Sequence, residues 1–304
     1  MALTRAPLSQ RPLRLLAIGA TGRLGRVLVP VWRRTEFGQA AAVELVVQAR
    51  REGRGGDVVF DPLAEPDALQ RAVGAADVVL GLAGVTAGSA EDMALNVTLA
   101  QAFCAAAQQA GKPVILASSA SVYGRPSTEA PLAGRPFPEA APLAPISEYG
   151  RAKQAMERMA QDYPACCCLR IGNVAGADAL LGHAAPEGGR VLDVFAEGEA
   201  LHGPLRSYIG PVTLAQAILR LARFMAAGAS VPQVINLAEA GVVDMAALLA
   251  AAGISYQTRP APDMAIARVE LDVSRALALG LVPERPVRAD RLVGEVIQLR
   301  GELS

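Results

Sequence analysis

The sequence predicts an α/β protein with a doubly wound parallel sheet and a small C-terminal lobe. Up to about residue 120, short apolar runs alternate with alanine-rich stretches that favour helix. Most of these runs lack polar alternation, which is typical of parallel strands that helices cover on both faces. The predicted strands are Leu13–Ile18, Val43–Gln48, Asp57–Phe60, Asp77–Leu80, Val114–Ala117, Cys166–Ile171 and Val234–Ala238.

The composition points to small-molecule partners. Lys plus Arg equals Asp plus Glu at 29 each, so no net charge draws the chain to nucleic acid or to a membrane surface. No apolar stretch approaches the roughly 20 residues that span a bilayer, and a cytoplasmic location is expected. The four cysteines, Cys104 and Cys166 to Cys168, suit neither a metal site nor a disulfide framework. We therefore predict no metal and reduced thiols.

A glycine-rich turn joins the first predicted strand to a helical stretch. Its sequence is Gly19-Ala20-Thr21-Gly22-Arg23-Leu24-Gly25. Residues without Cβ let backbone amides approach a pyrophosphate at the positive end of the following helix. In this context the turn predicts a Rossmann-type dinucleotide site, and a purely structural glycine turn is the alternative.

The end of the second predicted strand bears on the choice between NAD and NADP. An acidic residue there binds the ribose 2′-hydroxyl of NAD, whereas an arginine accommodates the 2′-phosphate of NADP. Here Arg50, Arg51 and Arg54 follow the strand, so Arg50 favours NADP slightly, and a solvated basic turn is the alternative. Asp61, after the third strand, is a candidate for the adenine end or an ordinary turn aspartate.

Three polar residues form a candidate catalytic group. Tyr149 and Lys153 are four residues apart, on one face of a helix predicted over Ser147–Asp162. A fixed positive charge beside a phenol favours the phenolate, so Lys153 is expected to bring the pKa of Tyr149 toward the working range. Ser119, after a buried strand, is placed to hydrogen-bond the substrate oxygen that Tyr149 protonates or deprotonates.

With these residues the chain resembles the extended short-chain dehydrogenase/reductase superfamily, in its NAD-dependent epimerase/dehydratase family. The resemblance extends to Leu82-Ala83-Gly84, to Asn96, and to the segment Ser118 to Gly124. It implies that Leu82, Ala83, Gly84, Asn96 and Ser118 belong to the cofactor site with Tyr149 and Lys153, and that Ser119 and Ser121 face the substrate.

The second half of the chain carries further likenesses to that family. Asn173, Arg206 and Arg259 lie in segments similar to those that hold the diphosphate of a nucleotide sugar. Two departures stand beside them: Gly210–Ala215 lacks the family's usual aspartate, and the stretch between Asn173 and Arg206 is short. These departures, with the arginines after the second strand, point toward an NADPH-using reductase.

The resemblance also implies an organisation and an activity. A dinucleotide-binding Rossmann domain is expected over residues 1–170, completed by about 207–238, with a small substrate-binding lobe from 171–206 and 239–304. The leading hypothesis is an NAD(P)-dependent epimerase or dehydratase of a nucleotide sugar, with Tyr149 as acid/base. The alternatives are an NADPH-dependent reductase of a small ketone or aldehyde, and a non-catalytic redox sensor. A homodimer through two long helices, 91–110 and 147–162, is expected.

Overall fold

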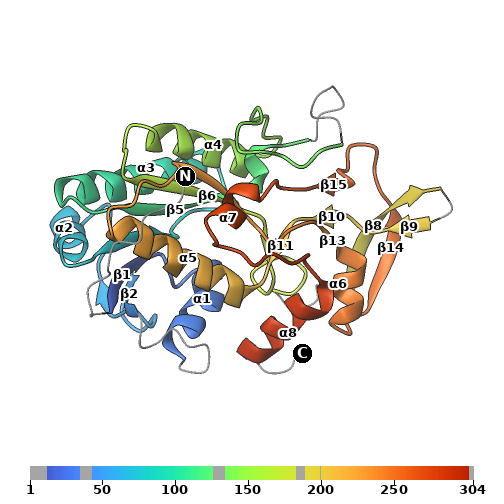
Figure 1. Cartoon of the computed structure of the whole chain (residues 1–304), viewed down its shortest axis with the longest axis horizontal. Coiled ribbons are helices and arrows are strands. Elements are labelled where there is room, and N and C mark those ends of the chain that lie inside the picture. The colour runs from blue at the N-terminus through green and yellow to red at the C-terminus, as the bar shows by residue number, and fades with distance from the viewer. Residues whose placement is uncertain (1–11, 35–42, 126–133, 183–188, 199, 301–304) are drawn as a thin grey trace.

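A seven-stranded parallel sheet forms the centre of the protein (Figure 1). The computed structural model describes residues 12–34, 43–125, 134–182, 189–198 and 200–300. The strand order is β12-β6-β5-β4-β1-β2-β3, so the chain winds outward in both directions from β1. The strands are β1 (Leu13–Ile18), β2 (Val43–Ala49), β3 (Val58–Val59), β4 (Val78–Gly81), β5 (Val114–Ser119), β6 (Cys166–Ile171) and β12 (Val234–Leu237). The predicted α/β class and doubly wound parallel sheet are confirmed.

Every predicted strand of the sheet is present, with small differences at the ends. β1 and β6 have the predicted bounds. β5 continues two residues further, to Ser119, because its pairing with β6 extends to Ile171. β3 is shorter than predicted, since as the edge strand it pairs with β2 only at two residues.

Helices cover both faces of the sheet, as Figure 1 shows. One face carries α1 (Arg23–Arg33) and α5 (Pro211–Ala226), and the other carries α2 (Pro66–Gly74), α3 (Ala90–Gln109) and α4 (Glu148–Ala160). Ser89 begins α3 with a capping box to Asp92, and Ser147 caps α4 by accepting from the Gly150 amide. Both long helices therefore lie within about two residues of their predicted bounds.

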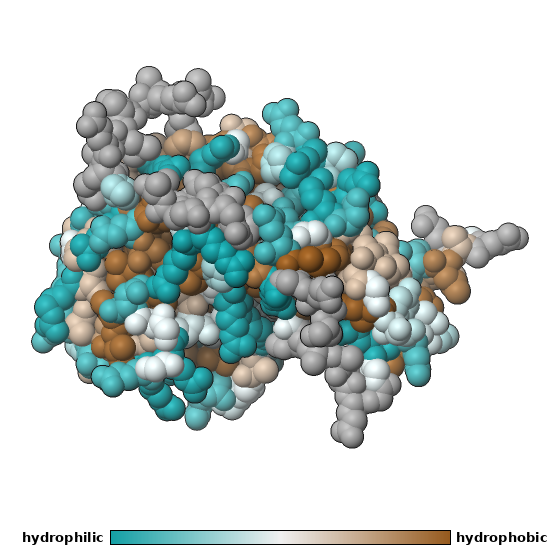
Figure 2. All heavy atoms as spheres, turned by 90° about the horizontal axis from the view of Figure 1, so that it is seen from below, coloured by the Kyte–Doolittle hydropathy of each residue, from teal (hydrophilic) through white to brown (hydrophobic). Residues whose placement is uncertain are grey.

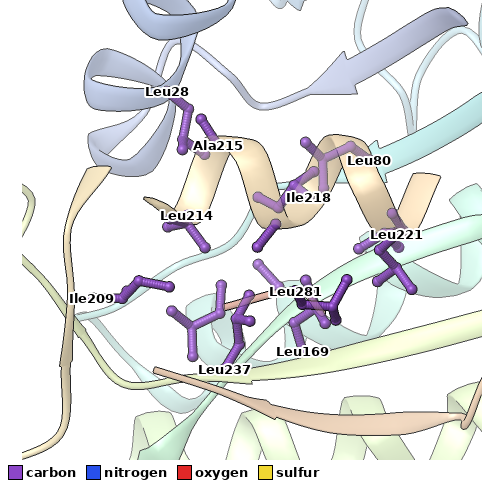
Figure 3. Packing of buried hydrophobic residues seen from close by; sticks show 14 of the residues in the cluster. Leu28, Leu80, Leu169, Ile209, Leu214, Ala215, Ile218, Leu221, Leu237 and Leu281 are labelled. Atoms are coloured by element: carbon purple, nitrogen blue, oxygen red, sulfur yellow. The ribbon is translucent and has the colours of Figure 1, made fainter. Parts of the chain in front are cut away.

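Apolar packing joins the α1–α5 layer to the sheet. Leu214, Ile218 and Leu221 of α5 point at side chains of the sheet such as Leu80 and Leu169 (Figure 3). All five are at most 1% exposed, and truncation of one such leucine to alanine typically costs about 2–5 kcal/mol. This layer fixes α1, and with it the glycine loop at the start of α1.

The rest of the chain forms small sheets and helices at one end of the molecule (Figure 1). β7 (Asn173–Val174) pairs with β11 (Tyr208–Ile209), β10 (Leu205–Arg206) lies between β13 (Val243–Asp244) and β15 (Arg268–Val269), and β8 (Arg190–Glu197) lies between β14 (Tyr256–Pro260) and β9 (Ala200–His202). The helices here are α6 (Met245–Ala251), α7 (Ser274–Ala278) and α8 (Ala289–Arg300). α7 packs on β12 and α8 on α5 and α6, which ties these segments back to the central sheet.

The β8–β9 hairpin projects from the body at the right of Figure 2 and exposes Val191 and Leu201.

Among the described helices, none combines the length and apolar character that crossing a bilayer requires.

Candidate active site

A cleft of about 1040 Å³ lies at the carboxyl edge of the sheet. Its walls come from the loop after β1, the ends of β2, β4, β5 and β6, and the first two turns of α4. Ligands of doubly wound sheets bind at this edge, where neighbouring connections leave in opposite directions. The cleft therefore brings together segments that are more than 100 residues apart in the sequence.

The glycine loop packs too closely for larger residues. Gly19 has φ +80°, and a Cβ there would lie 2.4 Å from the Ala83 backbone. A Cβ on Gly25 would lie 1.7 Å from the Ala20 carbonyl oxygen. Gly22 is the N-cap of α1 and provides no side-chain cap, and the first turn has no acidic residue. The first amides of α1 are thus available to an anion, which fits a dinucleotide pyrophosphate.

The predicted loop residues take two kinds of position. Gly19, Thr21, Gly22, Arg23 and Leu24 line the cleft, whereas Gly25 is buried against the Ala20 backbone.

The cleft also has an arginine-rich end. Arg50, Arg51 and Arg54 line it after β2, and all three are exposed. Asp61 lines it as well, but one of its carboxylate oxygens accepts from the amides of Leu63 and Ala64, at 2.9 and 3.2 Å. Asp61 is therefore a turn aspartate at the rim of the cleft.

Ser119, Tyr149 and Lys153 meet at the other end of the cleft. The Lys153 Nζ lies 5.8 Å from the centre of the Tyr149 ring and donates to the Ala117 carbonyl at 2.8 Å. The Ser119 Oγ donates to the Ser121 Oγ at 3.1 Å. The spacing of Tyr149 and Lys153 on α4 thus places both beside the end of β5.

The electrostatics of Tyr149 differ from the expectation. Burial raises the pKa of Tyr149 above its ordinary value, although a hydrogen bond with Ser119 and the charge of Arg23 oppose this. Burial also lowers the pKa of Lys153 to about 8, although interactions with Cys168 and Glu157 oppose this. The expectation that the pKa of Tyr149 falls toward the working range was wrong for this structure, because burial of the phenol outweighs the Ser119 hydrogen bond and the Arg23 charge.

The segment after β4 forms another wall of the cleft. Leu82, Ala83 and Gly84 line the cleft. Asn96 is 1% exposed and lies behind that wall, where it accepts from the Val85 amide at 3.3 Å and donates to the Val85 carbonyl at 3.0 Å. Asn96 therefore shapes the wall from behind.

The predicted substrate residues are not all brought together. Ser121 and Asn173 line the cleft with Ser119, whereas Arg206 on β10 and Arg259 on β14 do not line it. Arg206 donates to the backbone carbonyls of Leu205, Ile266 and Ala267. Arg259 forms an ion pair with Asp193 at 2.6 Å.

Several residues that line or support the site were missed in the sequence, among them Gln48, Thr86 and Glu157. Gln48 is buried, accepts from the Gly19 amide at 3.2 Å and donates to the Phe60 carbonyl at 2.6 Å, so it joins the glycine loop to β2. Thr86 accepts from the Arg23 guanidinium within the cleft. Glu157 accepts from Ser118, which lines the cleft. A signal existed for Glu157, because it lies one helical turn beyond Lys153 on the same face.

The fold and the cleft define a dinucleotide-binding enzyme of the short-chain dehydrogenase type. The sequence model of the NAD-dependent epimerase/dehydratase family matches residues 15–238, which is more than half of the chain. The chain therefore belongs to the NAD-dependent epimerase/dehydratase family. A search of curated proteins finds no match.

Solved structures share this fold at low identity. A short-chain dehydrogenase/reductase superfamily protein from Agrobacterium tumefaciens with bound NAD is 21% identical, with a TM-score of 0.69 and coverage of 94% of this chain and 97% of that chain. UDP-glucose 4-epimerase from Stenotrophomonas maltophila, solved with NAD and formylated UDP-arabinopyranose, is 20% identical, with a TM-score of 0.70 and the same coverages. UDP-glucose 4-epimerase from Brucella ovis in complex with NAD is 19% identical, with a TM-score of 0.73 and coverages of 92% and 96%.

Proposed function

We propose that this protein transfers hydride between a substrate carbon and a nicotinamide dinucleotide, with Tyr149 as the acid/base. The observation that carries the proposal is that Ser119, Tyr149 and Lys153 line one cleft with the glycine loop and the uncapped start of α1. A bound nicotinamide dinucleotide would supply the hydride acceptor or donor. The presence of the acid/base group also argues against the alternative of a redox sensor without turnover.

Each residue of the group has a separate role in the proposed hydride transfer. Ser119 donates a hydrogen bond to the reacting oxygen of the substrate. When a hydroxyl is oxidised, Tyr149 takes its proton as hydride leaves the carbon; when a carbonyl is reduced, Tyr149 returns a proton to the nascent alkoxide. Lys153 in its ammonium form stabilises the phenolate of Tyr149. Asn173 contacts the part of the substrate that lies toward the lobe.

We propose a nucleotide sugar as the substrate and an epimerase or dehydratase as the activity. The family and the solved relatives with UDP-sugar ligands support this class. In such a cycle a keto intermediate is formed and reduced again, so the cofactor is regenerated. Asn173 lines the cleft and belongs to segment 171–206, which is expected to be part of the substrate-binding lobe.

A second candidate is an NADPH-dependent reductase of a small ketone or aldehyde. Two observations favour it. The donors of Arg206 are taken by backbone carbonyls and Arg259 is paired with Asp193, so neither arginine faces the cleft. Burial also keeps Tyr149 in its phenol form, which is the form that gives a proton to an alkoxide.

We propose NADP as the preferred cofactor. Arg50, Arg51 and Arg54 are unpaired within the described residues and line the end of the cleft next to β2, where an arginine suits a 2′-phosphate. The solved relatives hold NAD, so this preference separates the chain from them.

One experiment tests these proposals together. The purified protein is examined by native mass spectrometry for copurified dinucleotide and then titrated with NADH and NADPH. Turnover is followed with UDP-glucose and with small ketones, and the Tyr149→Phe variant is the control for the chemistry. Retained cofactor with no net change in its redox state supports the epimerase or dehydratase, and net NADPH consumption supports the reductase. Hydride transfer at the wild-type rate by Tyr149→Phe would contradict the proposed mechanism.

A further inference from the structure

Glu157 continues the face of α4 that bears the catalytic pair. Tyr149, Lys153 and Glu157 are spaced four residues apart, so their side chains follow one another along the helix. Tyr149 and Lys153 line the cleft, whereas Glu157 is 4% exposed and lies deeper in the protein. A carboxylate at this depth costs free energy unless it is paired and hydrogen-bonded, so its partners require an explanation.

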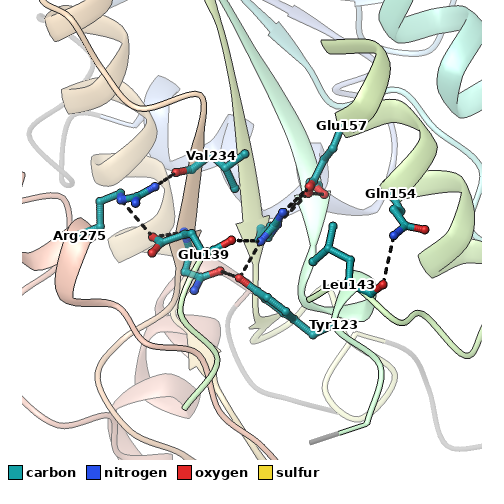
Figure 4. A network of polar contacts seen from close by, with 10 residues as sticks. Tyr123, Glu139, Leu143, Gln154, Glu157, Val234 and Arg275 are labelled. Carbon is teal, nitrogen blue, oxygen red and sulfur yellow. Dashed lines mark hydrogen bonds and ion pairs between the residues drawn. The ribbon is translucent and has the colours of Figure 1, made fainter. Parts of the chain in front are cut away.

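The partners of Glu157 are donors from the two neighbouring strands β5 and β6. Arg170 of β6 donates from Nε to both oxygens at 3.1 Å and from Nη2 to Oε2 at 2.7 Å, and Ser118 of β5 donates to Oε1. Arg170 is itself fixed because its Nη1 donates to the Tyr123 hydroxyl and to the Glu139 backbone carbonyl, each at 2.9 Å. Figure 4 shows Tyr123, Glu139 and Glu157 in one polar network. Glu157 thus occupies a rigid place between β5, β6 and α4.

The same stretch of β5 binds Lys153. The Lys153 ammonium donates to the Ala117 carbonyl. The hydroxyl of the next residue, Ser118, donates to the Glu157 carboxylate. The titratable and charged groups around Lys153 are Tyr149 and Glu157 on its own helix, Cys168 on β6, and Arg170 behind Glu157. Among these four groups, Glu157 is the one carboxylate.

We propose that Glu157 is a positioning residue whose buried charge keeps Lys153 protonated beside Tyr149. This inference rests on the proposed role of Lys153 in hydride transfer. The physical reason is charge balance in a desolvated place: without Glu157, two cations, Arg170 and Lys153, would be buried together. A guanidinium does not lose its proton in proteins, so the proton would leave Lys153. With Glu157 in place, burial already brings the pKa of Lys153 down to about 8, close to the working range.

The protonation of Lys153 can be followed directly by NMR, because Lys112 and Lys153 are the only lysines in the sequence. Lysine labelled with ¹³C at Cε gives two signals in NMR, which Lys112→Arg assigns. In the ligand-free, full-length Glu157→Gln protein, the Lys153 midpoint is expected to fall by roughly one pH unit or more, with the Lys112 midpoint unchanged. Glu148→Gln, an exposed carboxylate on the same helix, is the matched control and leaves both midpoints in place.

A second variant covers the case in which Glu157→Gln does not fold, since it leaves Arg170 buried without its partner. The double variant Glu157→Gln/Arg170→Gln removes both charges and is better tolerated. Its Lys153 midpoint should lie below that of the wild type, and above that of Glu157→Gln if the single variant folds. A Lys153 midpoint equal to the wild type in either folded variant overturns the proposal. The titration needs no substrate, so its result is separate from the turnover of Tyr149→Phe, which tests the proposed function.

Discussion

Arg23 stands in the glycine loop, yet its charge also reaches the acid/base group. Its guanidinium donates to Thr86 within the cleft, and its charge lowers the pKa of Tyr149 against the effect of burial. The loop that is expected to receive the cofactor therefore also tunes the phenol.

Arg23→Gln is expected to raise the pKa of Tyr149 further, because it removes one of the two effects that oppose burial. Biosynthetic 3-fluorotyrosine, whose phenol is more acidic than that of tyrosine, brings the titration into an accessible pH range for ¹⁹F NMR, and Tyr149→Phe assigns the signal. In oxidation, where Tyr149 acts as the base, the rise in rate should move to higher pH. Arg26→Gln, another cleft arginine, serves as the control; an equal Tyr149 midpoint in the wild type and Arg23→Gln would contradict the prediction.

Comparison of Gly19 with Gly53 distinguishes two effects of adding a side chain: the cost of a left-handed backbone and the clash with neighbouring atoms. Gly19 and Gly53 both have positive φ, +80° and +72°, but only at Gly19 would a Cβ meet another part of the chain, the Ala83 backbone at 2.4 Å. Gly53→Ala should therefore cost about 1–2 kcal/mol for the backbone alone. Gly19→Ala should cost more and weaken dinucleotide binding by roughly 100-fold. Urea unfolding and NADPH titration measure the two effects, and equal losses in both variants would be evidence against the close packing of the loop.

At the scale of the element, α5 depends on a carboxylate from another helix. Glu295 of α8 accepts from the amides of Val212 and Thr213 at 2.9 and 3.4 Å, and so satisfies the start of α5. The pKa of Glu295 is nevertheless raised, chiefly by burial and also by the charge of Glu239. This cap therefore joins α8 to α5 through a carboxylate whose charged form is disfavoured by burial and by Glu239.

The sign of the resulting pH dependence follows from linkage. A carboxyl group whose pKa is higher in the folded state binds more protons there than in the unfolded state, so its contribution to stability falls as pH rises from the ordinary value of 4.5 through the raised one. Glu295→Gln keeps an oxygen for the Val212 amide and removes the charge. Its free energy of unfolding relative to the wild type should therefore increase between pH 4 and pH 8 in urea titrations. Glu284→Gln, at an exposed position, is the control, and a difference that does not grow with pH would refute the linkage.

The strands and long helices were predictable because their signals are local. Apolar runs end at glycine, proline or charged residues, and Ser89 and Ser147 mark where α3 and α4 begin. The spacing of Tyr149 and Lys153 likewise placed both beside β5. The direction of the Tyr149 pKa was not predictable, because it depends on burial by distant segments.

The arginines show the limit of motif reading most clearly. Arg206 resembles a diphosphate-binding residue in sequence, but its donors meet carbonyls of residues 266 and 267, some 60 positions away. The partners of Glu157 were likewise not predictable from the local sequence, since Ser118 and Arg170 come from two other elements. Which donors are already engaged is a property of tertiary structure.

At the scale of the whole molecule, α3 and α4 offer a surface for a second copy of the chain. The two helices pack side by side on one face of the sheet. The outer side of α3 carries Ala94, Thr98 and Gln101, which are exposed and lie three or four residues apart. Ala94 and Thr98 have small side chains that let another helix approach closely, so we predict a homodimer through this surface.

Thr98→Arg is expected to convert the dimer to a monomer, because an unpaired charge at the centre of a helix–helix contact costs about 3–5 kcal/mol. Sedimentation velocity over a range of protein concentrations measures the change. Ala226→Arg places the same charge on an exposed site of α5, on the opposite face of the sheet, and should leave the dimer intact. Since the cleft is built from a single chain, the monomeric variant should still bind NADPH. A wild-type protein that sediments as a monomer at every concentration would show that α3 and α4 face solvent.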